Sequence, residues 1–276
     1  MTNFLTIDVE EYFQVENFKR HVSYAEWDSF PSRVVPNTRK ILALLKRHRV
    51  RATFFVLGWV AEKFPELVRE ISTDGHEVAS HGYRHELIFR QTAEEFRRDV
   101  REGKDLLENL IQKRVLGYRA PSWSLTQKSP WVYQILREEG IVYDSSVFPY
   151  YRYDGGFRDG ETKPYQVDAG LWEFPVSTFR VAGQNIPFAG GGYFRLFPYR
   201  LIQYGVRRLN ARGQPAMVYL HPWEFDPGQP RFQASYLSSF RHYVNLHTTE
   251  RKLDRLLGAL SFSSLDSALG PEKGCP

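Results

Sequence analysis

The sequence predicts an α/β protein: a deformed (β/α) barrel of about seven parallel strands, in a single domain with long loops. Three observations support this prediction. Short β-favouring runs alternate with helical segments, the chain has 276 residues, and no repeat or Gly/Ser-rich linker marks a second domain. Connected β and α units give a parallel sheet, and α/β barrels often use about 250 residues as one unit. We therefore expect one domain over residues 1–276, with 230–276 as a C-terminal helical extension of unclear role.

The first half of the chain supplies five expected strands with helices between them. Runs of β-branched and aromatic residues predict strands over 4–8, 51–57, 77–79, 115–118 and 141–143. Apolar residues at helical spacing predict a helix that opens at 36–38, and others over 60–71, 93–112 and 130–139.

The second half is less regular. Strands are expected over 171–176 and 216–220, and helices over 198–211 and 236–260. Residues 150–170 and 188–195 are expected to be long loops, which in a compact domain are usually functional.

Composition excludes several classes of protein. The chain has 37 Lys plus Arg and 32 Asp plus Glu, a net charge of +5, and the basic residues are interspersed with acidic ones, which argues against nucleic-acid binding. Aromatic residues make up 15% of the chain, which suits a surface that stacks on sugar rings. The most apolar stretch, 54–61, is too short to span a membrane, and the N-terminal residues do not resemble a signal peptide. We therefore expect a cytoplasmic protein without a membrane span; the oligomeric state stays open.

Polar residues follow several of the expected strands. His81 and His85 are four residues apart, so on a helical turn both imidazoles would face the same way, which suits a metal site. Asp8 and Glu10 end the first strand, where side-chain alternation sends both to one side and Glu11 elsewhere. Catalytic residues of barrel enzymes lie at the carboxyl ends of the strands.

Three more strand ends carry polar groups. They are the segments 119–124, 143–146 and 219–223. Each is ordinary alone, since Arg119 could be a surface charge, Asp144 a helix cap and His221 a loop residue. Their shared position is what favours a common site.

Taken together, these motifs resemble the polysaccharide deacetylase superfamily, the NodB-homology domain of carbohydrate esterase family 4. The resembling segments are Thr6-Ile7-Asp8-Val9, Ser80 to His85, Arg119-Ala120-Pro121 and Leu220-His221. The resemblance implies a deformed (β/α) barrel, a divalent metal, and removal of an N- or O-acetyl group from a sugar. Residues 143–149 and 190–195 also resemble the subgroup found at exopolysaccharide loci of exosortase-bearing bacteria.

The chain departs from the family pattern at two positions. Val9 stands where most members carry a second, metal-binding Asp, and Glu10 fits a variant arrangement found in some relatives. Ser122 stands where the family has an aromatic residue whose backbone N–H helps to bind the oxyanion, a role that a backbone donor can keep.

The resemblance implies a hydrolase that removes N-acetyl, in second place O-acetyl, groups from a glycan or its biosynthetic sugar intermediate. The metal, Zn²⁺ with Co²⁺ or Ni²⁺ as alternatives, is expected on Glu10, His81 and His85, with water in its open position. The expected roles of the other residues are as follows: Asp8 as general base, Arg119 as its partner, His221 as general acid, Asp144 as the residue that orients His221, the Ser122 N–H as oxyanion donor, and Trp123, Tyr193 and Trp223 as sugar-stacking residues.

Two other functions stay open. One is a deformylase or allantoinase-like amidohydrolase on the same fold, including a metal-independent form, which Val9 makes credible. The other is a non-catalytic carbohydrate-binding member, against which the joint presence of Asp8, Arg119 and His221 speaks. A glycosidase is disfavoured because no isolated pair of carboxylates flanks a cleft.

Overall fold

The sheet is curled and mostly parallel, as predicted. The computed structural model describes residues 1–19, 21–150, 156–157, 160–168, 170–181 and 183–270. Within these residues nine strands form one sheet in the order β10-β1-β2-β3-β4-β5-β7-β6, with β11 paired to β1 beside this path. Seven consecutive strands from β10 to β7 run parallel, and β6 is antiparallel to β7. The strands are β1 (Asn3–Val9), β2 (Thr53–Val56), β3 (Glu77–Ser80), β4 (Gly117–Tyr118), β5 (Tyr143–Asp144), β6 (Tyr165–Asp168), β7 (Leu171–Glu173), β10 (Met217–Leu220) and β11 (Phe262–Ser263).

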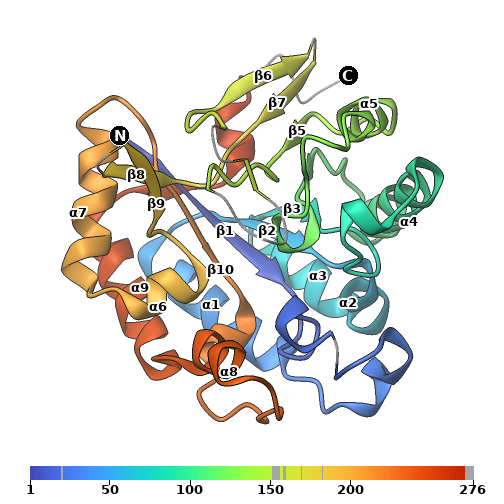
Figure 1. Cartoon of the computed structure of the whole chain (residues 1–276), viewed down its shortest axis with the longest axis horizontal. Coiled ribbons are helices and arrows are strands. Elements are labelled where there is room, and N and C mark those ends of the chain that lie inside the picture. Colours follow the sequence, from blue (N-terminus) through green and yellow to red (C-terminus); the bar gives the residue numbers. More distant parts are fainter. Residues whose placement is uncertain (20, 151–155, 158–159, 169, 182, 271–276) are drawn as a thin grey trace.

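Helices surround this sheet (Figure 1). They are α1 (Val34–His48), α2 (Gly58–Lys63), α3 (Pro65–Thr73), α4 (Ala93–Ile111), α5 (Trp131–Glu138), α6 (Gly191–Leu196), α7 (Tyr199–Asn210), α8 (Tyr236–Tyr243) and α9 (Thr249–Ala259). A separate hairpin consists of β8 (Thr178–Val181) and β9 (Gln184–Pro187). The architecture confirms the predicted deformed (β/α) barrel.

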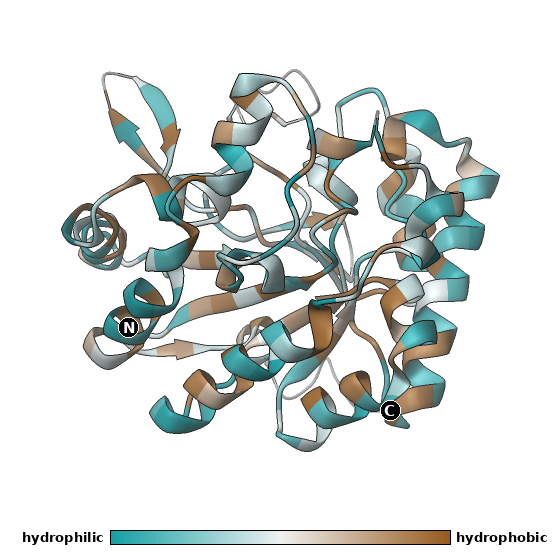
Figure 2. Cartoon of the chain, turned by 90° about the horizontal axis from the view of Figure 1, so that it is seen from below, coloured by the Kyte–Doolittle hydropathy of each residue, from teal (hydrophilic) through white to brown (hydrophobic). Residues whose placement is uncertain are grey.

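The core lies between the helices and the sheet. Every residue of β1, β2 and β3 is buried, as expected for parallel strands that are covered on both faces. The surrounding helices carry both hydrophobic and hydrophilic segments (Figure 2), since one face packs inward and the other meets water. In α1 the inward face consists of the buried residues Ile41, Leu42, Leu44 and Leu45.

Two of the predicted helices are interrupted. The helix expected over 60–71 is divided between α2 and α3, because Pro65 follows Phe64, whose backbone is non-helical at φ −131° and ψ 59°. The helix expected over 236–260 ends at Tyr243 and starts again at Thr249, and Asn245 between them has a left-handed backbone with φ 51°.

Some elements appear where loops were expected. The segment 188–195 contains most of α6, and 150–170 contains β6, although 151–155, 158–159 and 169 lie outside the described residues. The segment 230–270 contributes α8, α9 and β11. Among the described residues, no helix combines the length and the apolar character needed to cross a bilayer.

A buried carboxyl group ties the C-terminal segment to the sheet. Glu77 on β3 accepts hydrogen bonds from Thr53 Oγ1 at 2.5 Å, Tyr143 Oη at 2.8 Å and the backbone N–H of Asp266 at 3.0 Å. Burial, together with the charge of Asp266, raises the pKa of Glu77 from 4.5 to about 7. Because this pKa is raised on folding, the stabilisation from the protonated group is present below pH 4.5 and is lost as the pH rises through 7.

We therefore expect Glu77→Gln to be more stable than the wild type at pH 8. The difference in the free energy of unfolding between the two proteins should shift in favour of the variant by up to about 3 kcal/mol from pH 4.5 to pH 8. A glutamine keeps one oxygen for Thr53 and Asp266, and its amide can donate to the Tyr143 oxygen. Urea unfolding at pH 4.5, 6 and 8 measures the difference, with the exposed Glu94→Gln as control. A difference between variant and wild type that does not change with pH would contradict the expected titration.

Candidate active site

The polar residues at the strand ends meet in one buried site. The His221 Nε2 atom lies 3.8 Å from Asp8 Oδ2 and 3.7 Å from Glu10 Oε1, so β10 and β1 bring these three residues together. Glu11 points away and accepts hydrogen bonds from the backbone N–H groups of Arg33 and Val34 at the start of α1, as alternation predicts.

Glu10, His81 and His85 form a cluster that fits a metal ion. All three are buried, and one ligand atom from each lies within 4.8 Å of the others. The Glu10 Oε2 atom is 2.8 Å from His85 Nε2 and 4.0 Å from His81 Nε2. Two imidazoles and one carboxylate form a donor set that zinc accepts while one position stays open. Glu10 therefore offers a carboxylate to this cluster, although Val9 before it cannot.

The protonation states suit coordination. Burial lowers the pKa of His81 to about 4, so this ring is neutral near pH 7. Its Nδ1 lies 2.8 Å from the Arg119 carbonyl oxygen, which leaves Nε2 directed toward Glu10. Burial raises the pKa of Glu10, but the nearby His85, His221 and His81 outweigh it and lower the value to about 2. Glu10 is therefore a carboxylate.

The two histidines do not lie on a helical turn, and that part of the prediction is wrong. Residues 81–85 form an irregular loop in which Gly82 has φ 73° and His85 has φ 52°. Asp99 on α4 holds this loop by accepting hydrogen bonds from the backbone N–H groups of Tyr83 and Arg84. A Cβ atom on Gly82 would lie 2.6 Å from Asp99 Oδ2, so the loop needs glycine there.

Asp8 is held by Arg119. The fully buried Arg119 guanidinium donates from Nη1 to Asp8 Oδ1 at 2.6 Å and to Thr6 Oγ1 at 2.7 Å. It also donates to the backbone carbonyl and the side-chain oxygen of Ser145. These contacts fix Asp8 with its second oxygen, Oδ2, turned toward His221.

Glu224, and not Asp144, orients His221. The Nδ1 atom of His221 lies 2.7 Å from Glu224 Oε1, while the buried Asp144 accepts from Ser146 Oγ at 2.6 Å. The predicted pairing of Asp144 with His221 is therefore corrected. The physical reason is position, because Glu224 lies three residues after His221 in the turn that follows β10.

Glu224 is itself fixed by a buried arginine. Arg195 Nε donates to Glu224 Oε2 at 2.6 Å, and both side chains are almost completely buried. Burial alone would lower the pKa of His221, but the hydrogen bond to Glu224 and the charges of Glu10, Glu224 and Asp8 raise it to about 9. His221 is therefore protonated near neutral pH in the absence of a bound cation.

Asp144 belongs to a second layer beneath the site. Burial raises the pKa of Asp144 to about 6, although the neighbouring Glu173 lowers it, and burial together with the charge of Asp144 raises the pKa of Glu173 well above its usual value. Ser146 donates to Asp144 and accepts from the backbone N–H of Ala120 at 2.8 Å. Asp144 thus supports the loop that carries Ser122.

The Ser122 loop has unusual backbone geometry. Ser122 and Trp123 have positive φ angles of 52° and 58°. Such conformations are uncommon for residues other than glycine and cluster at functional sites. The role of the Ser122 N–H as an oxyanion donor stays a prediction.

The tryptophans are packed instead of exposed. Trp223 is 7% exposed, lies between the stacked rings of His221 and His242, and donates from Nε1 to Glu10 Oε1 at 3.1 Å. Trp123 is 5% exposed, with the Arg119 guanidinium 4.6 Å from its ring centre. Their predicted role as open sugar-stacking surfaces is corrected to that of positioning the site. Tyr193 is half-buried on α6, and its role stays a prediction.

Sequence reasoning missed Glu224 and Arg195. A signal for Glu224 existed, since His221 and Glu224 have the three-residue spacing of a capping box, and the Glu224 side chain accepts from the His221 backbone N–H at 3.0 Å. Arg195 lies in the segment 190–195 that resembles the exopolysaccharide subgroup, but no signal indicated its contact with Glu224, which joins residues 29 positions apart.

Comparison with known proteins gives matches over most of the chain. The polysaccharide deacetylase family model matches residues 16–141, and a model described as a domain of unknown function, DUF3473, matches residues 145–270. The first match includes His81, His85 and Arg119, and the second includes His221 and Glu224.

The individual relatives match this chain over only part of its length or at low sequence identity. The peptidoglycan deacetylase of Helicobacter pylori is 32% identical over 143 residues, which cover 50% of this chain and 47% of that protein. The chain spans between about a quarter and about half of the length of such curated relatives. The crystal structure of a candidate polysaccharide deacetylase from Mycobacterium smegmatis aligns with a TM-score of 0.61 at 22% identity, covering 99% of this chain and 91% of that one. A CE4 family pseudoenzyme from Bacillus anthracis aligns with a TM-score of 0.52 at 15% identity, covering 97% and 65% of the two chains. At these identities the likeness concerns the fold alone.

Proposed function

From the membership of this chain in the polysaccharide deacetylase superfamily, we propose that it is a metal-dependent hydrolase that removes N-acetyl groups from a glycan. The observation that carries the proposal is the meeting of three features in one buried site: the Glu10, His81 and His85 cluster, a fixed carboxylate and a fixed imidazole. A merely carbohydrate-binding protein has no chemical need for a base and an acid so close together.

The two sides of the site suit the two proton transfers of amide hydrolysis. Asp8, oriented by Arg119, takes a proton from the attacking water. His221, protonated and held by Glu224, donates a proton to the leaving amine nitrogen. The backbone N–H of Ser122 donates to the developing oxyanion, an interaction worth roughly 3 kcal/mol in comparable sites.

Glu10, His81 and His85 would hold the cation, for which we expect Zn²⁺. A divalent ion there would supply Lewis-acid polarisation of the acetyl carbonyl and of the water. Trp223 keeps Glu10 in place through its indole N–H, and the Arg119 carbonyl keeps the ring of His81 oriented.

Elemental analysis of the wild type and Glu10→Ala tests the proposal. We expect about one zinc-class ion per chain in the wild type, loss of that ion in Glu10→Ala after dialysis, and release of acetate from N-acetylated glycans by the wild type alone. The exposed Glu94→Ala is the control and should keep its metal.

Chelation and reconstitution complete the test. A chelator should abolish acetate release, and added zinc or cobalt should restore it. If the wild type holds no metal after reconstitution, the proposed mechanism is wrong, and a metal-independent amidohydrolase or a binding protein replaces it. If it holds metal but releases no acetate, the substrate class is wrong.

A further inference from the structure

A cavity of about 950 Å³, which we call the hairpin cavity, lies between the β8–β9 hairpin and the end of α7. These elements are side by side in Figure 1. The described lining comes from the loop before β6, from both strands of the hairpin and from the segment between α7 and β10. Small-molecule sites in proteins have volumes of about 300–1,000 Å³, so the cavity is large enough for such a ligand.

The hairpin cavity is separate from the candidate active site. Gln214 in its lining precedes β10, whereas His221 of the active site follows β10, so the two sites lie at opposite ends of this strand. The described lining falls entirely within residues 145–270, outside the segment 16–141 that matches the polysaccharide deacetylase model. The active-site residues that do not line the cavity are Asp8, Glu10, His81, His85, Arg119 and His221.

Three cations without an acidic partner line the hairpin cavity. They are Lys163 before β6, Arg180 on β8 and Arg212 after α7. Arg180 donates to the backbone carbonyl oxygen of Gly183 at 3.3 Å, and none of the three side chains forms an ion pair within the described part of the chain. Glu161 is the one acidic residue of the described lining. The cavity therefore carries an excess of positive charge.

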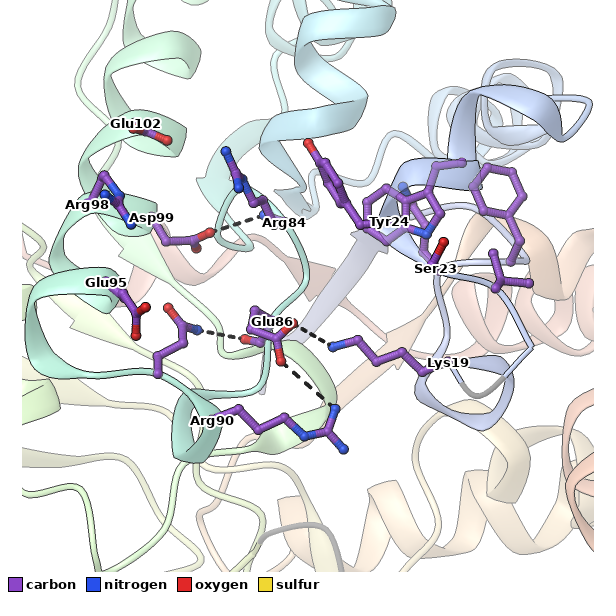
Figure 3. Close-up of a pocket in the computed structure, with 15 residues that line it drawn as sticks. Lys19, Ser23, Tyr24, Arg84, Glu86, Arg90, Glu95, Arg98, Asp99 and Glu102 are labelled. Carbon is purple, nitrogen blue, oxygen red and sulfur yellow. Dashed lines mark hydrogen bonds and ion pairs between the residues drawn. The ribbon is translucent and has the colours of Figure 1, made fainter.

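A smaller hollow beside the His85 loop shows the opposite arrangement (Figure 3). Its lining contains four cationic and four acidic side chains. Lys19 pairs with Glu86 at 3.0 Å, and Arg90 pairs with Glu16 at 3.0 Å. These cations are neutralised by the protein itself, whereas those of the hairpin cavity are left for a ligand to neutralise.

A buried hydroxyl group in the lining also lacks a partner. Thr178 begins β8 and is 3% exposed. Its Oγ1 atom has no hydrogen-bond partner among the described residues. Buried hydroxyl groups are nearly always hydrogen-bonded, so an unpaired one in the wall of a cavity points to an acceptor that a ligand supplies.

The cations determine the class of ligand. Arginine and lysine bind phosphate oxygens through charge-assisted hydrogen bonds. A carboxylate has a single charge and two oxygens, whereas a phosphate monoester has up to two charges and three free oxygens, which matches several cations and one hydroxyl group. The cavity is larger than a phosphate group, and the amides of Gln184 and Asn185 in its lining can bind the polar remainder of a ligand.

We infer that the hairpin cavity binds a phosphate-bearing ligand, with Lys163, Arg180 and Arg212 around the phosphate and Thr178 donating to one of its oxygens. The phosphate group belongs either to a soluble phosphate ester or to a lipid headgroup, since the same contacts recognise both. The site does not depend on the proposed deacetylase reaction. It also gives a role to residues 160–163, which lie in a segment that the sequence predicts to be a functional loop.

Calorimetric titration of the full chain with glycerol 3-phosphate tests the inference. We expect Arg180→Ala and Arg212→Ala each to raise the Kd roughly five- to tenfold. Thr178→Val keeps the charge and the shape of the side chain but removes the hydroxyl group, and it should raise the Kd about threefold.

Two control variants locate the binding. Arg200→Ala removes the same charge from an exposed position on α7 outside the lining, and it should bind the probe as the wild type does. Glu10→Ala should also bind as the wild type does, because the metal-ligand cluster is not part of the hairpin cavity. This second control keeps the test independent of the proposed deacetylase reaction.

Vesicle sedimentation distinguishes the two sources of phosphate. If vesicles of phosphatidylcholine and phosphatidylglycerol bind the wild type, while Arg180→Ala and Arg212→Ala weaken this binding, the ligand is a lipid headgroup. If these vesicles bind no more protein than phosphatidylcholine vesicles do, and glycerol 3-phosphate binds, the ligand is a soluble phosphate ester.

Three results would overturn the inference. One is that glycerol 3-phosphate does not bind, or that it binds to Arg180→Ala and Arg212→Ala as to the wild type. Another is an equal loss in Arg200→Ala, which would assign the binding to general surface charge. The third is unchanged binding by Thr178→Val, which would remove the buried hydroxyl group from the site. Arg180 and Arg212 are exposed, so their variants should fold.

Discussion

Asp8→Asn is expected to lower kcat for deacetylation by about 10³-fold, within the range typical of removing a general base. Asparagine keeps the size of Asp8 and an oxygen for the Arg119 Nη1 atom, but it cannot accept a proton from water. Arg119 remains bonded to Thr6 and Ser145, so its buried charge keeps other partners. The loss therefore concerns the reaction and not the fold.

Three measurements check this result: acetate release under saturating substrate, metal content, and the thermal midpoint. Metal content should be that of the wild type, because Asp8 is not part of the Glu10, His81 and His85 cluster. The exposed Asp74→Asn serves as control. An Asp8→Asn enzyme that keeps more than a tenth of the wild-type kcat would remove Asp8 from the role of base.

The residues that touch the reacting atoms in this scheme could be predicted because of how parallel sheets are built. The carboxyl ends of parallel strands meet at one edge, so polar residues directly after β1, β3, β4 and β10 converge even when they are far apart in sequence. Alternation along β1 also separated Glu10 from Glu11, whose side chain the structure places at the start of α1. These inferences need only the strand positions.

The supporting residues could not be predicted in the same way. Asp144 follows a strand as His221 does, yet its carboxyl group is buried with Glu173 and Ser146, and only the packing decides this. Nothing in the sequence near Trp223 indicates that a histidine from α8 will cover its ring. Side chains that are fixed by contacts between distant segments carry no local pattern.

The interrupted helices have a related cause. Apolar residues at helical spacing predicted one continuous helix over 60–71 and another over 236–260, but one proline and one asparagine with a left-handed backbone divide these segments. Pro65 was a visible signal, whereas Asn245 can adopt many conformations in isolation. The second break has a consequence for the site, because the chain around it places the carbonyl oxygens of Arg241, His242 and Val244 on Arg195.

The assignment of Glu224 leads to the second large effect. Glu224→Gln is expected to lower kcat for an N-acetyl amide substrate by roughly 10²-fold. Glutamine keeps an oxygen for His221 Nδ1 but removes the negative charge that favours the imidazolium, so less of the enzyme carries the proton that the leaving amine needs. Arg195 keeps its three carbonyl partners, so the variant should fold, with reduced stability.

Comparison of two leaving groups distinguishes loss of the acid from general damage to the site. An amine leaves only after protonation, whereas the phenolate of an aryl acetate leaves unprotonated. Glu224→Gln should therefore lose roughly 10²-fold in kcat on the amide and less than threefold on the aryl ester.

Asp144→Asn is the matched variant, because the sequence predicted that Asp144, at the end of its strand, orients His221. The kcat of this variant should stay within about threefold of the wild-type value on both substrates. If Asp144→Asn shows the amide-selective loss and Glu224→Gln does not, the hydrogen bond between Glu224 and His221 does not serve the proton transfer. If Glu224→Gln loses both activities equally, Glu224 maintains the structure of the site, and the proton for the leaving group must come from elsewhere.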